Sequence, residues 1–273
     1  MYCSDYHLHT LISSDSPASL EQQAQSALEA GLNELCVTDH WNLLGQQGND
    51  LPHTRDWTES IAQCHKARQQ FGDRLEIRLG VEVGNGEIDP IGVSNGLAQA
   101  GNELDFVIGS LHNMSLGSGG LGIFTAAKQC QQIEEGIALL DDYIATLNAL
   151  AVTDTFDVIG HVIYPLRYLP HPWQLTLDPY EEQLRMLFQT LIQKGKGIEF
   201  NTTQGHTIQE WIPVLKLYRE CGGEILTIGS DAHRAGQVGA GFHDAAALLN
   251  SLGFRWYATY RNRNPVFHPL ELP

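Results

Sequence analysis

The chain has 273 residues, of which 42% are hydrophobic and 18% are charged, and its formal net charge is −16. A chain of this length and balance can bury a substantial core, which excludes large-scale disorder. The acidic total argues against binding a long nucleic acid, because such binding requires basic surface that displaces counterions.

Short apolar runs alternate with amphipathic segments along the whole chain. We expect strands at Cys3–His9, Glu34–Asp39, Glu76–Glu82, Phe106–His112, Asp157–Ile163, Gly197–Asn201 and Leu226–Asp231. Helical spacing of apolar residues predicts helices at Ser19–Ala30, Thr58–Phe71, Ala126–Leu150, Pro179–Lys194, Ile208–Cys221 and Asp244–Leu252. This alternation predicts an α/β fold with a parallel sheet. Because seven strands fall short of the usual eight, we expect a distorted (β/α)7 TIM-like barrel, with residues 1–273 as one domain.

Two further segments each have two interpretations. The glycine-rich run Gly117–Gly122 directly follows His112 and is either a mobile lid over a site or a plain surface connector. The run Phe254–Tyr260 near the C-terminus is either a final strand or part of an interface.

The cysteines and the apolar stretches bear on the cellular setting. Five widely spaced cysteines without a CxxC pair are typical of reduced, buried thiols: Cys3, Cys36, Cys64, Cys130 and Cys221. Apolar stretches stay far short of the roughly 18 to 20 residues of a membrane span, and the N-terminus has no basic-then-apolar leader. We therefore expect a cytoplasmic protein without a membrane partner, and the sequence leaves its oligomeric state open.

Histidine and carboxylate residues stand at the ends of the expected strands, where a parallel barrel gathers its catalytic groups. His7 and His9 are two residues apart on the first strand, so both side chains point to the same face. They lie about 7 Å apart along the strand and can converge on one cation. An HxH pair alone is weak evidence in a chain with 12 histidines, but Asp231 and His233 repeat the spacing after the last strand. These two strands become neighbours only if the barrel closes.

Five other residues complete the candidate set. Asp15 is either a ligand or a turn residue, and of the adjacent pair Asp39 and His40 one is expected to bind a cation and the other to support it. A buried carboxylate at Glu82 would be costly unless it were paired or bound to metal, and it can bridge two cations. The nine candidate ligands are His7, His9, Asp15, His40, Glu82, His112, His161, Asp231 and His233. Because a catalytic zinc-like ion takes three to four protein ligands, nine ligands suit three ions.

The same positions resemble the polymerase-and-histidinol-phosphatase (PHP) superfamily, and within it the stand-alone histidinol phosphatases. The matching motifs, which span almost the whole chain, are Asp5–Thr10, Thr38–His40, Gly80–Glu82, Gly109–His112, Ile159–His161, Ile198–Thr202 and Gly229–His233. The resemblance implies a distorted (β/α)7 barrel with a trinuclear metal site at the C-terminal ends of the strands. The ions it implies are zinc, iron or manganese.

The resemblance also implies how the ligands divide. One ion would be held by His7, His9, Glu82 and Asp231. Glu82 would bridge to a second ion held by His112 and His161, and the third would be held by Asp15, His40 and His233. Two departures from the family pattern concern the substrate: Val162–Ile163 stand where many relatives have an acidic residue, and Thr203–His206 replace a segment that often carries a glycine and an arginine.

The expected activity is hydrolysis of a small phosphate monoester, with L-histidinol phosphate as a candidate substrate. Hydroxide formed from a metal-activated water would attack phosphorus in line, and the chemistry would fall to Glu82, Asp231 and His233. Such a phosphorylated metabolite is compatible with the acidic total, since bound cations can dominate the field inside a pocket. The proton donor to the leaving group is left open between Asp39 and a metal-bound water.

The substrate contacts are predicted from three residues. Arg167, six residues after His161, is the first candidate for a bidentate phosphate clamp. His206 and Arg234 are weaker candidates, and for Arg234 an exposed position beside the barrel mouth is the alternative. Two other functions are considered: a phosphodiesterase or exonuclease of the same fold, and a non-catalytic metal-binding regulatory module.

Overall fold

A parallel sheet forms the centre of the fold. The computed structural model describes residues 1–270. The sheet runs in the order β1 (Ser4–Asp5), β2 (Glu34–Val37), β4 (Glu76–Gly84), β5 (Leu104–Ser110), β6 (Val158–Ile159), β7 (Gly197–Asn201) and β8 (Leu226–Gly229). Neighbouring strands in this order are all parallel. A strand lies at each expected position, although β1 and β6 are only two residues long and end before His7 and His161. The predicted fold class is confirmed.

Hydrogen bonds between the first and last strands bring the sheet nearly to a closed barrel. The Tyr6 N–H donates to the carbonyl of Ile228 at 3.0 Å, and the Asp231 N–H donates to the carbonyl of His7 at 2.8 Å. For His7 and His9 to lie beside Asp231 and His233, the barrel had to close, and these hydrogen bonds show that closure. As a consequence, the ligand candidates at both ends of the chain lie beside one another.

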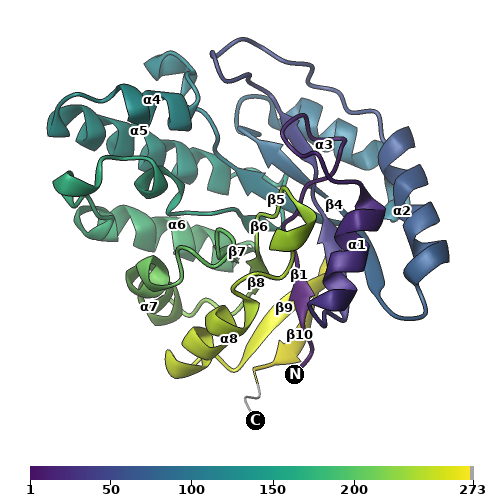
Figure 1. Cartoon of the computed structure of the whole chain (residues 1–273). Helices are drawn as coiled ribbons and strands as arrows, with labels where there is room; N and C mark the ends of the chain where they lie inside the picture. The colour runs from purple at the N-terminus through teal and green to yellow at the C-terminus, as the bar shows by residue number, and fades with distance from the viewer. Residues whose placement is uncertain (271–273) are drawn as a thin grey trace.

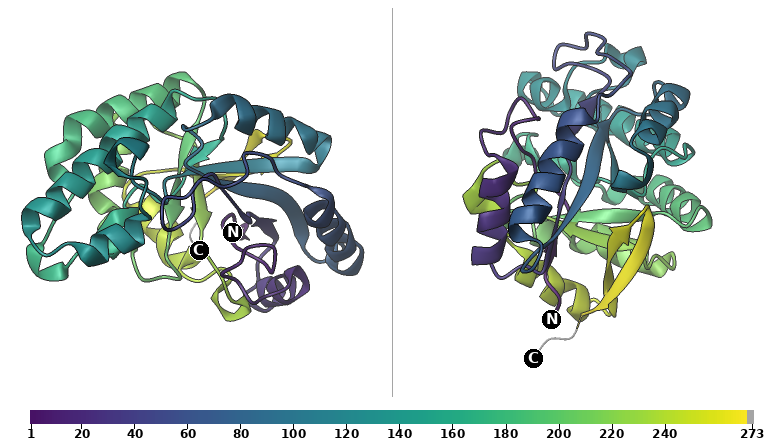
Figure 2. Two further views of the ribbon diagram at one scale, coloured as in Figure 1. Left: turned by 90° about the horizontal axis from the view of Figure 1, so that it is seen from above. Right: turned by 90° about the vertical axis from the view of Figure 1, so that its right-hand side faces the viewer.

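Helices flank the sheet on both sides and bury most of the apolar core against it (Figures 1 and 2). The helices are α1 (Leu20–Glu29), α2 (Thr58–Phe71), α3 (Pro90–Gln99), α4 (Ile123–Gln129), α5 (Ile133–Ala151), α6 (Glu181–Gln193), α7 (Ile212–Glu220) and α8 (Phe242–Ser251). Figure 1 shows α1 to α3 on one side of the strands and α4 to α7 on the other. The first helix begins as its sequence suggests, with Ser19 and Gln22 forming a capping box.

Several elements differ from the expectations. The single helix expected at Ala126–Leu150 is wrong: α4 ends at Gln129, and α5 starts anew after a capping box between Gln132 and Glu135. Helix α3 was not expected, because its glycine-rich sequence has weak helical periodicity, yet Asp89 caps its N-terminus. The short strand β3 (His40–Asn42) was also missed, and it extends the sheet by pairing with β4.

A C-terminal hairpin covers the end of the barrel at which the strands begin. It consists of β9 (Trp256–Arg261) and β10 (Asn264–Pro269), which pair antiparallel. The Tyr260 ring packs 4.8 Å from the Phe106 ring, and the Tyr6 hydroxyl donates to the Tyr260 carbonyl at 3.1 Å. Of the two interpretations of Phe254–Tyr260, a final strand is the one observed.

The glycine-rich segment after β5 is held by hydrogen bonds. The Asn113 side-chain amide donates to the carbonyls of Gly45 and Gly120, both at 2.8 Å. The Gly122 N–H donates to the Gln46 carbonyl at 3.0 Å. The segment thus forms a connector fastened to the loop that follows β3, and these contacts favour that interpretation over a mobile lid.

Candidate metal centre

The strand ends place the nine candidate ligands together. Seven of them line a small cavity of about 170 Å³ at the C-terminal end of the barrel: Asp15, His40, Glu82, His112, His161, Asp231 and His233. His7 and His9 lie buried beside this cavity and reach the carboxylates that line it. Residues separated by more than 220 positions in sequence therefore share one site, because parallel strands present their carboxyl ends on one face.

Glu82 is the centre of the cluster. Its Oε1 lies 3.0 Å from His112 Nε2 and 2.9 Å from His161 Nε2. Its Oε2 lies 2.8 Å from His40 Nδ1 and 3.3 Å from His7 Nε2. Because each oxygen faces a different pair of imidazoles, the carboxylate has the geometry of a group that can bridge two cations.

Two carboxylates complete the cluster on its other sides. Asp231 Oδ1 lies 3.6 Å from His7 Nε2 and 3.4 Å from His9 Nε2. Asp15 Oδ2 lies 3.3 Å from His40 Nε2 and 3.5 Å from His233 Nε2. Asp15 thus contacts two imidazoles from other loops, although its side chain is 53% exposed. These contacts favour the interpretation of Asp15 as a ligand over that of a residue that only forms a turn.

Several buried ligand-type atoms have no hydrogen-bond partner within residues 1–270. They include His7 Nε2 and His9 Nε2, and also His40 Nδ1 and Glu82 Oε2, which lie 2.8 Å apart but are not aligned as a hydrogen bond. Buried polar atoms are almost always hydrogen-bonded, so such a group of exceptions requires an explanation. Imidazole nitrogens and carboxylate oxygens that converge in this way fit divalent cations, which use these ligands.

The ligand atoms form three overlapping groups, in each of which the atoms lie within 4.8 Å of one another. The groups are His7, His9 and Glu82; His9, His40 and His233; and His40, Glu82 and His112. The first group lies within the first ion's expected ligand set. Each of the other two groups combines residues from two of the ligand sets that the resemblance implies.

Charges within the cluster shift its pKa values strongly. Burial by itself lowers the pKa of His7, but Glu199, Glu82 and Asp231 outweigh it and hold that pKa well above its ordinary value. Burial likewise opposes protonation of His40, yet the Glu82 carboxylate raises the pKa to about 10. The site thus attracts positive charge, which either protons or metal cations can supply.

His9 shows the opposite shift. Burial and the neighbouring His40 lower its pKa to about 3. His9 is therefore neutral at ordinary pH, and a neutral imidazole is the form that binds a metal cation.

Two of the ligand candidates have strained backbones. His161 has φ of 25° and Asp231 has φ of 60°, a region that residues with side chains seldom adopt. The Gln204 side-chain amide donates to the Asp231 carbonyl at 2.8 Å and so supports that conformation. Such strain persists where surrounding contacts enforce it, and it is concentrated at functional sites.

Asp39 supports the site without facing its cavity. Its Oδ1 accepts hydrogen bonds of 2.7 Å from the Thr10 N–H and from the Ser13 hydroxyl. Its Oδ2 accepts another, also of 2.7 Å, from the Thr10 hydroxyl. These bonds occupy both carboxylate oxygens, so Asp39 anchors the loop after β1 and is a poor candidate for a proton donor.

The three predicted substrate contacts differ in position. Arg167 is 7% exposed in its side chain and donates to Asp231 Oδ2 at 3.2 Å and to Asn201 Oδ1 at 2.8 Å, which places it beside the cluster. His206 is exposed and lines a larger cavity of about 600 Å³ that Arg167 also lines. Arg234 is exposed and lines neither this cavity nor the small one, so the structure does not bring it to the site.

Sequence reasoning missed several groups that border the cluster. The Tyr164 ring lies 4.6 Å from the His161 ring, and Tyr168 lines both the small and the larger cavity. Asn42 Oδ1 lies 2.8 Å from His112 Nδ1, and Glu199 Oε1 lies 2.6 Å from His7 Nδ1. The short strand β3 and the turn after β6 carry little periodic signal, whereas Glu199 lies in a recognised motif and could have been found.

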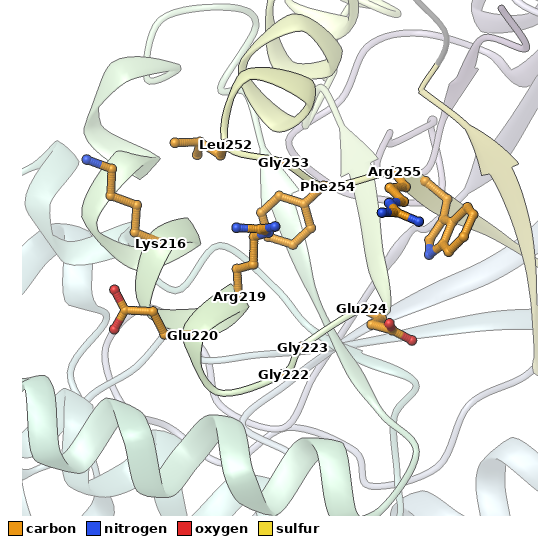
Figure 3. Close-up of a pocket in the computed structure, with 11 residues that line it drawn as sticks. Lys216, Arg219, Glu220, Gly222, Gly223, Glu224, Leu252, Gly253, Phe254 and Arg255 are labelled. Carbon is orange, nitrogen blue, oxygen red and sulfur yellow. The ribbon is translucent and has the colours of Figure 1, made fainter.

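Another cleft, of about 480 Å³, lies away from these residues (Figure 3). In Figure 3, Arg219 of α7 is directed towards Phe254, whereas Lys216 and Glu220 of the same helix point away from Phe254 and Arg255. None of the candidate ligands or substrate contacts lines it, and it lies beside the segment that leads into β8. The cluster at the opposite ends of the strands is therefore the candidate functional site.

Within residues 1–270, none of the helices combines the length and the apolar character needed to cross a membrane.

Comparison with known proteins gives consistent results. A model of the PHP domain family matches residues 5–203, which include all candidate ligands except Asp231 and His233. The chain is 31% identical to a probable histidinol-phosphatase of Deinococcus radiodurans, over 95% of this chain and 96% of that protein. It is 26% identical to a histidinol-phosphatase of Lactococcus lactis subsp. lactis, over 94% of this chain and 93% of that protein.

One solved structure resembles the fold over nearly its whole length. It is the crystal structure of histidinol phosphate phosphatase from Lactococcus lactis subsp. lactis, in a complex with zinc, L-histidinol and phosphate. The TM-score is 0.81 at 24% sequence identity, and the match covers 97% of this chain and 98% of that one. It shares the barrel described above.

Proposed function

Because the chain belongs to the PHP domain family, we propose that it hydrolyses L-histidinol phosphate to L-histidinol and inorganic phosphate. The protein is a metal-dependent phosphatase that acts on a small phosphate monoester, as its histidinol-phosphatase relatives indicate. The observation that carries the proposal is the convergence of imidazoles and carboxylates around Glu82 at the strand ends.

The proposed metal complement is three divalent ions of zinc, iron or manganese, held by the nine candidate ligands. Nine ligands with a bridging carboxylate support this number, because a catalytic ion uses three to four protein ligands and keeps a position open. When bound, such ions supply Lewis acidity, which lowers the pKa of water from about 15.7 to roughly 7 and neutralises phosphoryl charge. Glu82 and Asp231 provide carboxylates that lie among the imidazoles of the cluster, and His233 Nε2 lies 3.5 Å from Asp15 Oδ2.

Arg167 is proposed to hold the phosphoryl group against this centre. Its guanidinium already contacts Asp231 and Asn201, and its Nε is buried without a hydrogen-bond partner among residues 1–270. An arginine fork suits two phosphoryl oxygens at once. The phosphorus atom would thus be placed next to the ligands, with the ester oxygen directed away from them.

The larger cavity is proposed to receive the leaving alcohol. Arg167 and Tyr168 line it, and Tyr168 also lines the small cavity at the ligands. Its walls include apolar side chains such as Leu177, while the exposed carboxylates of Asp178 and Glu210 stand among the lining residues. This combination suits an imidazole ring joined through a methylene group to a carbon that bears an ammonium group.

The direct test is phosphate release from a panel of esters, with zinc, manganese or iron supplied. The panel contains L-histidinol phosphate, glycerol phosphate, p-nitrophenyl phosphate and a bis-nitrophenyl phosphodiester. We expect L-histidinol phosphate to have the largest kcat/KM and His9→Ala to abolish its turnover. Turnover of the diester alone would favour a phosphodiesterase, and no turnover by metal-loaded protein would favour a non-catalytic metal-binding module.

The leaving-group cavity is tested separately by removing its charge. The double change Asp178→Asn with Glu210→Gln should raise KM for L-histidinol phosphate several-fold and leave KM for p-nitrophenyl phosphate unchanged, because only the former carries cationic groups. Glu59→Gln on α2 removes an exposed carboxylate elsewhere and serves as the matched control. Equal effects on both substrates would contradict this role for the cavity without affecting the phosphatase assignment.

A further inference from the structure

Glu199 is a fully buried carboxylate that takes no part in the expected ligand set. It lies on β7 within the Ile198–Thr202 motif, and its exposed fraction is 0%. Its Oε1 lies 2.6 Å from His7 Nδ1, and its Oε2 accepts a hydrogen bond of 2.9 Å from the His161 main-chain N–H. We propose that Glu199 is a positioning residue that fixes His7 and His161, two ligands assigned to different ions, in their metal-binding orientations.

The contact with His7 selects which ring nitrogen faces the cations. When Nδ1 donates its proton to Glu199, the lone pair of Nε2 is left for a metal. His7 Nε2 points to the cluster, 3.3 Å from Glu82 Oε2 and 3.6 Å from Asp231 Oδ1, and has no hydrogen-bond partner within residues 1–270. The nitrogen that Glu199 leaves free is thus the one aimed at the centre.

The contact with His161 supports a strained backbone. His161 has φ of 25°, and its Nε2 lies 2.9 Å from Glu82 Oε1. The hydrogen bond from its N–H to Glu199 holds the main chain at the point where the side chain turns towards Glu82. One carboxylate therefore constrains the ring of one ligand and the backbone of another.

The glycine at position 229 leaves room for the contact between Glu199 and His7. A Cβ added at Gly229 would lie 2.4 Å from the Cβ of His7 and 2.5 Å from Glu199 Oε1, so a larger residue there would displace both. The Asn201 side-chain amide lies 3.2 Å from each Glu199 oxygen, and Arg167 donates to Asn201 Oδ1 at 2.8 Å. A continuous hydrogen-bond chain thus links the proposed phosphate contact to His7.

The test is Glu199→Gln, which keeps the size of the side chain and its ability to accept from the His161 N–H. The new amide can donate to His7 Nδ1, which would place the ring proton on Nε2, where it blocks metal binding. We expect the affinity for zinc, measured by competition with a chelator, to fall about 10- to 100-fold. Metal content per chain should fall too, while the melting temperature of the metal-free protein should change little.

Glu34→Gln is the matched control. Glu34 is likewise 0% exposed and lies on a barrel strand, but it pairs with Arg261 and the Tyr6 hydroxyl at the opposite end. We expect this change to lower the melting temperature and leave zinc affinity unaltered. Glu199→Asp, which retains the charge with a shorter reach, should show an intermediate loss of affinity and replaces the amide variant if the latter does not fold.

Two outcomes would overturn the positioning role. One is unaltered zinc affinity in Glu199→Gln. The other is a loss of affinity no larger than that of Glu34→Gln at an equal loss of melting temperature, because that result would indicate a structural role alone. Zinc affinity is measured without substrate, so either result is independent of which phosphate ester the protein hydrolyses.

Discussion

At the scale of single residues, Arg167 lies between the candidate ligands and the larger cavity, because it contacts Asp231 and lines that cavity. Its side chain is nearly buried and contacts Asp231 and Asn201, although it is supplied by the turn after β6 and not by a strand end. The spacing from His161 was enough to single it out in the sequence. The opposite outcome at Arg234, which stays exposed, shows that proximity in sequence to a ligand does not place a side chain in the site.

We expect Arg167→Lys to lower kcat/KM for a phosphate monoester roughly 10- to 100-fold, because lysine cannot reproduce a bidentate contact and each lost charged hydrogen bond costs about 1.5–3 kcal/mol. Inhibition by inorganic phosphate should weaken in parallel. Steady-state kinetics with phosphate as inhibitor checks both effects. Arg234→Lys is the control and should leave both constants unchanged; a normal kcat/KM in Arg167→Lys would refute the phosphate contact.

At the scale of elements, the C-terminal hairpin stabilises the barrel from the end opposite the ligands. Arg261 on β9 forms an ion pair with Glu34 on β2, with Nη1 to Oε1 at 2.5 Å and Nη2 to Oε2 at 3.2 Å. Burial opposes ionisation of Glu34, but the hydrogen bonds from Arg261, Tyr6 and Tyr2 lower its pKa below the ordinary value of 4.5. The hairpin thus supplies a positive partner for the buried Glu34 carboxylate, whose burial would otherwise destabilise the folded protein.

We expect Arg261→Met to reduce the free energy of unfolding by roughly 2–4 kcal/mol at pH 7, because it leaves a buried carboxylate without its main partner. A lowered folded-state pKa contributes stability that is present above the unfolded pKa and is lost as pH falls below about 4.5. Urea unfolding should therefore show a smaller difference between variant and parent in acid. Lys216→Met, an exposed change on α7, is the control; an equal loss there would contradict the ion-pair argument.

At the scale of the whole molecule, we infer that residues 1–270 act as one domain, since residues near both ends of the chain meet in one cluster of candidate metal ligands. The protein carries a formal charge of −16, and its centre concentrates carboxylates that raise the pKa of His7, His40 and His233. In the metal-free protein the imidazoles of His7 and His40 therefore bind protons at neutral pH. Metal binding must displace these protons, because only a neutral imidazole is a ligand.

We expect zinc affinity to rise with pH through neutrality towards the His40 pKa of about 10, by roughly tenfold per pH unit for each proton displaced. Calorimetric titration of metal-free protein in two buffers of different ionisation enthalpy would measure the protons released. Removing the metal should also lower the melting temperature, because ligands that bind only the folded state stabilise it. An affinity independent of pH between 6 and 9 would contradict the proton competition.

The sequence by itself determined the barrel class, its strands and the nine residues that converge. It could do so because parallel strands end on one face, so the residue after each apolar run is placed there by topology alone. Helix α3 and strand β3 were not predicted from the sequence, since a short or glycine-rich element depends on tertiary packing more than on periodicity. The break between α4 and α5 escaped it too, because apolar spacing continues across the interruption.

Only the tertiary structure decided which polar groups serve the centre. Asp39 and His40 are adjacent, yet one anchors a loop and the other faces Glu82. A motif and a spacing point to Glu199 and Arg167, but their partners His7 and Asp231 lie far away in the chain and are known only from the tertiary structure. The physical reason is that strand periodicity sets the direction of a side chain, whereas its partner is set by which strands and loops pack against it.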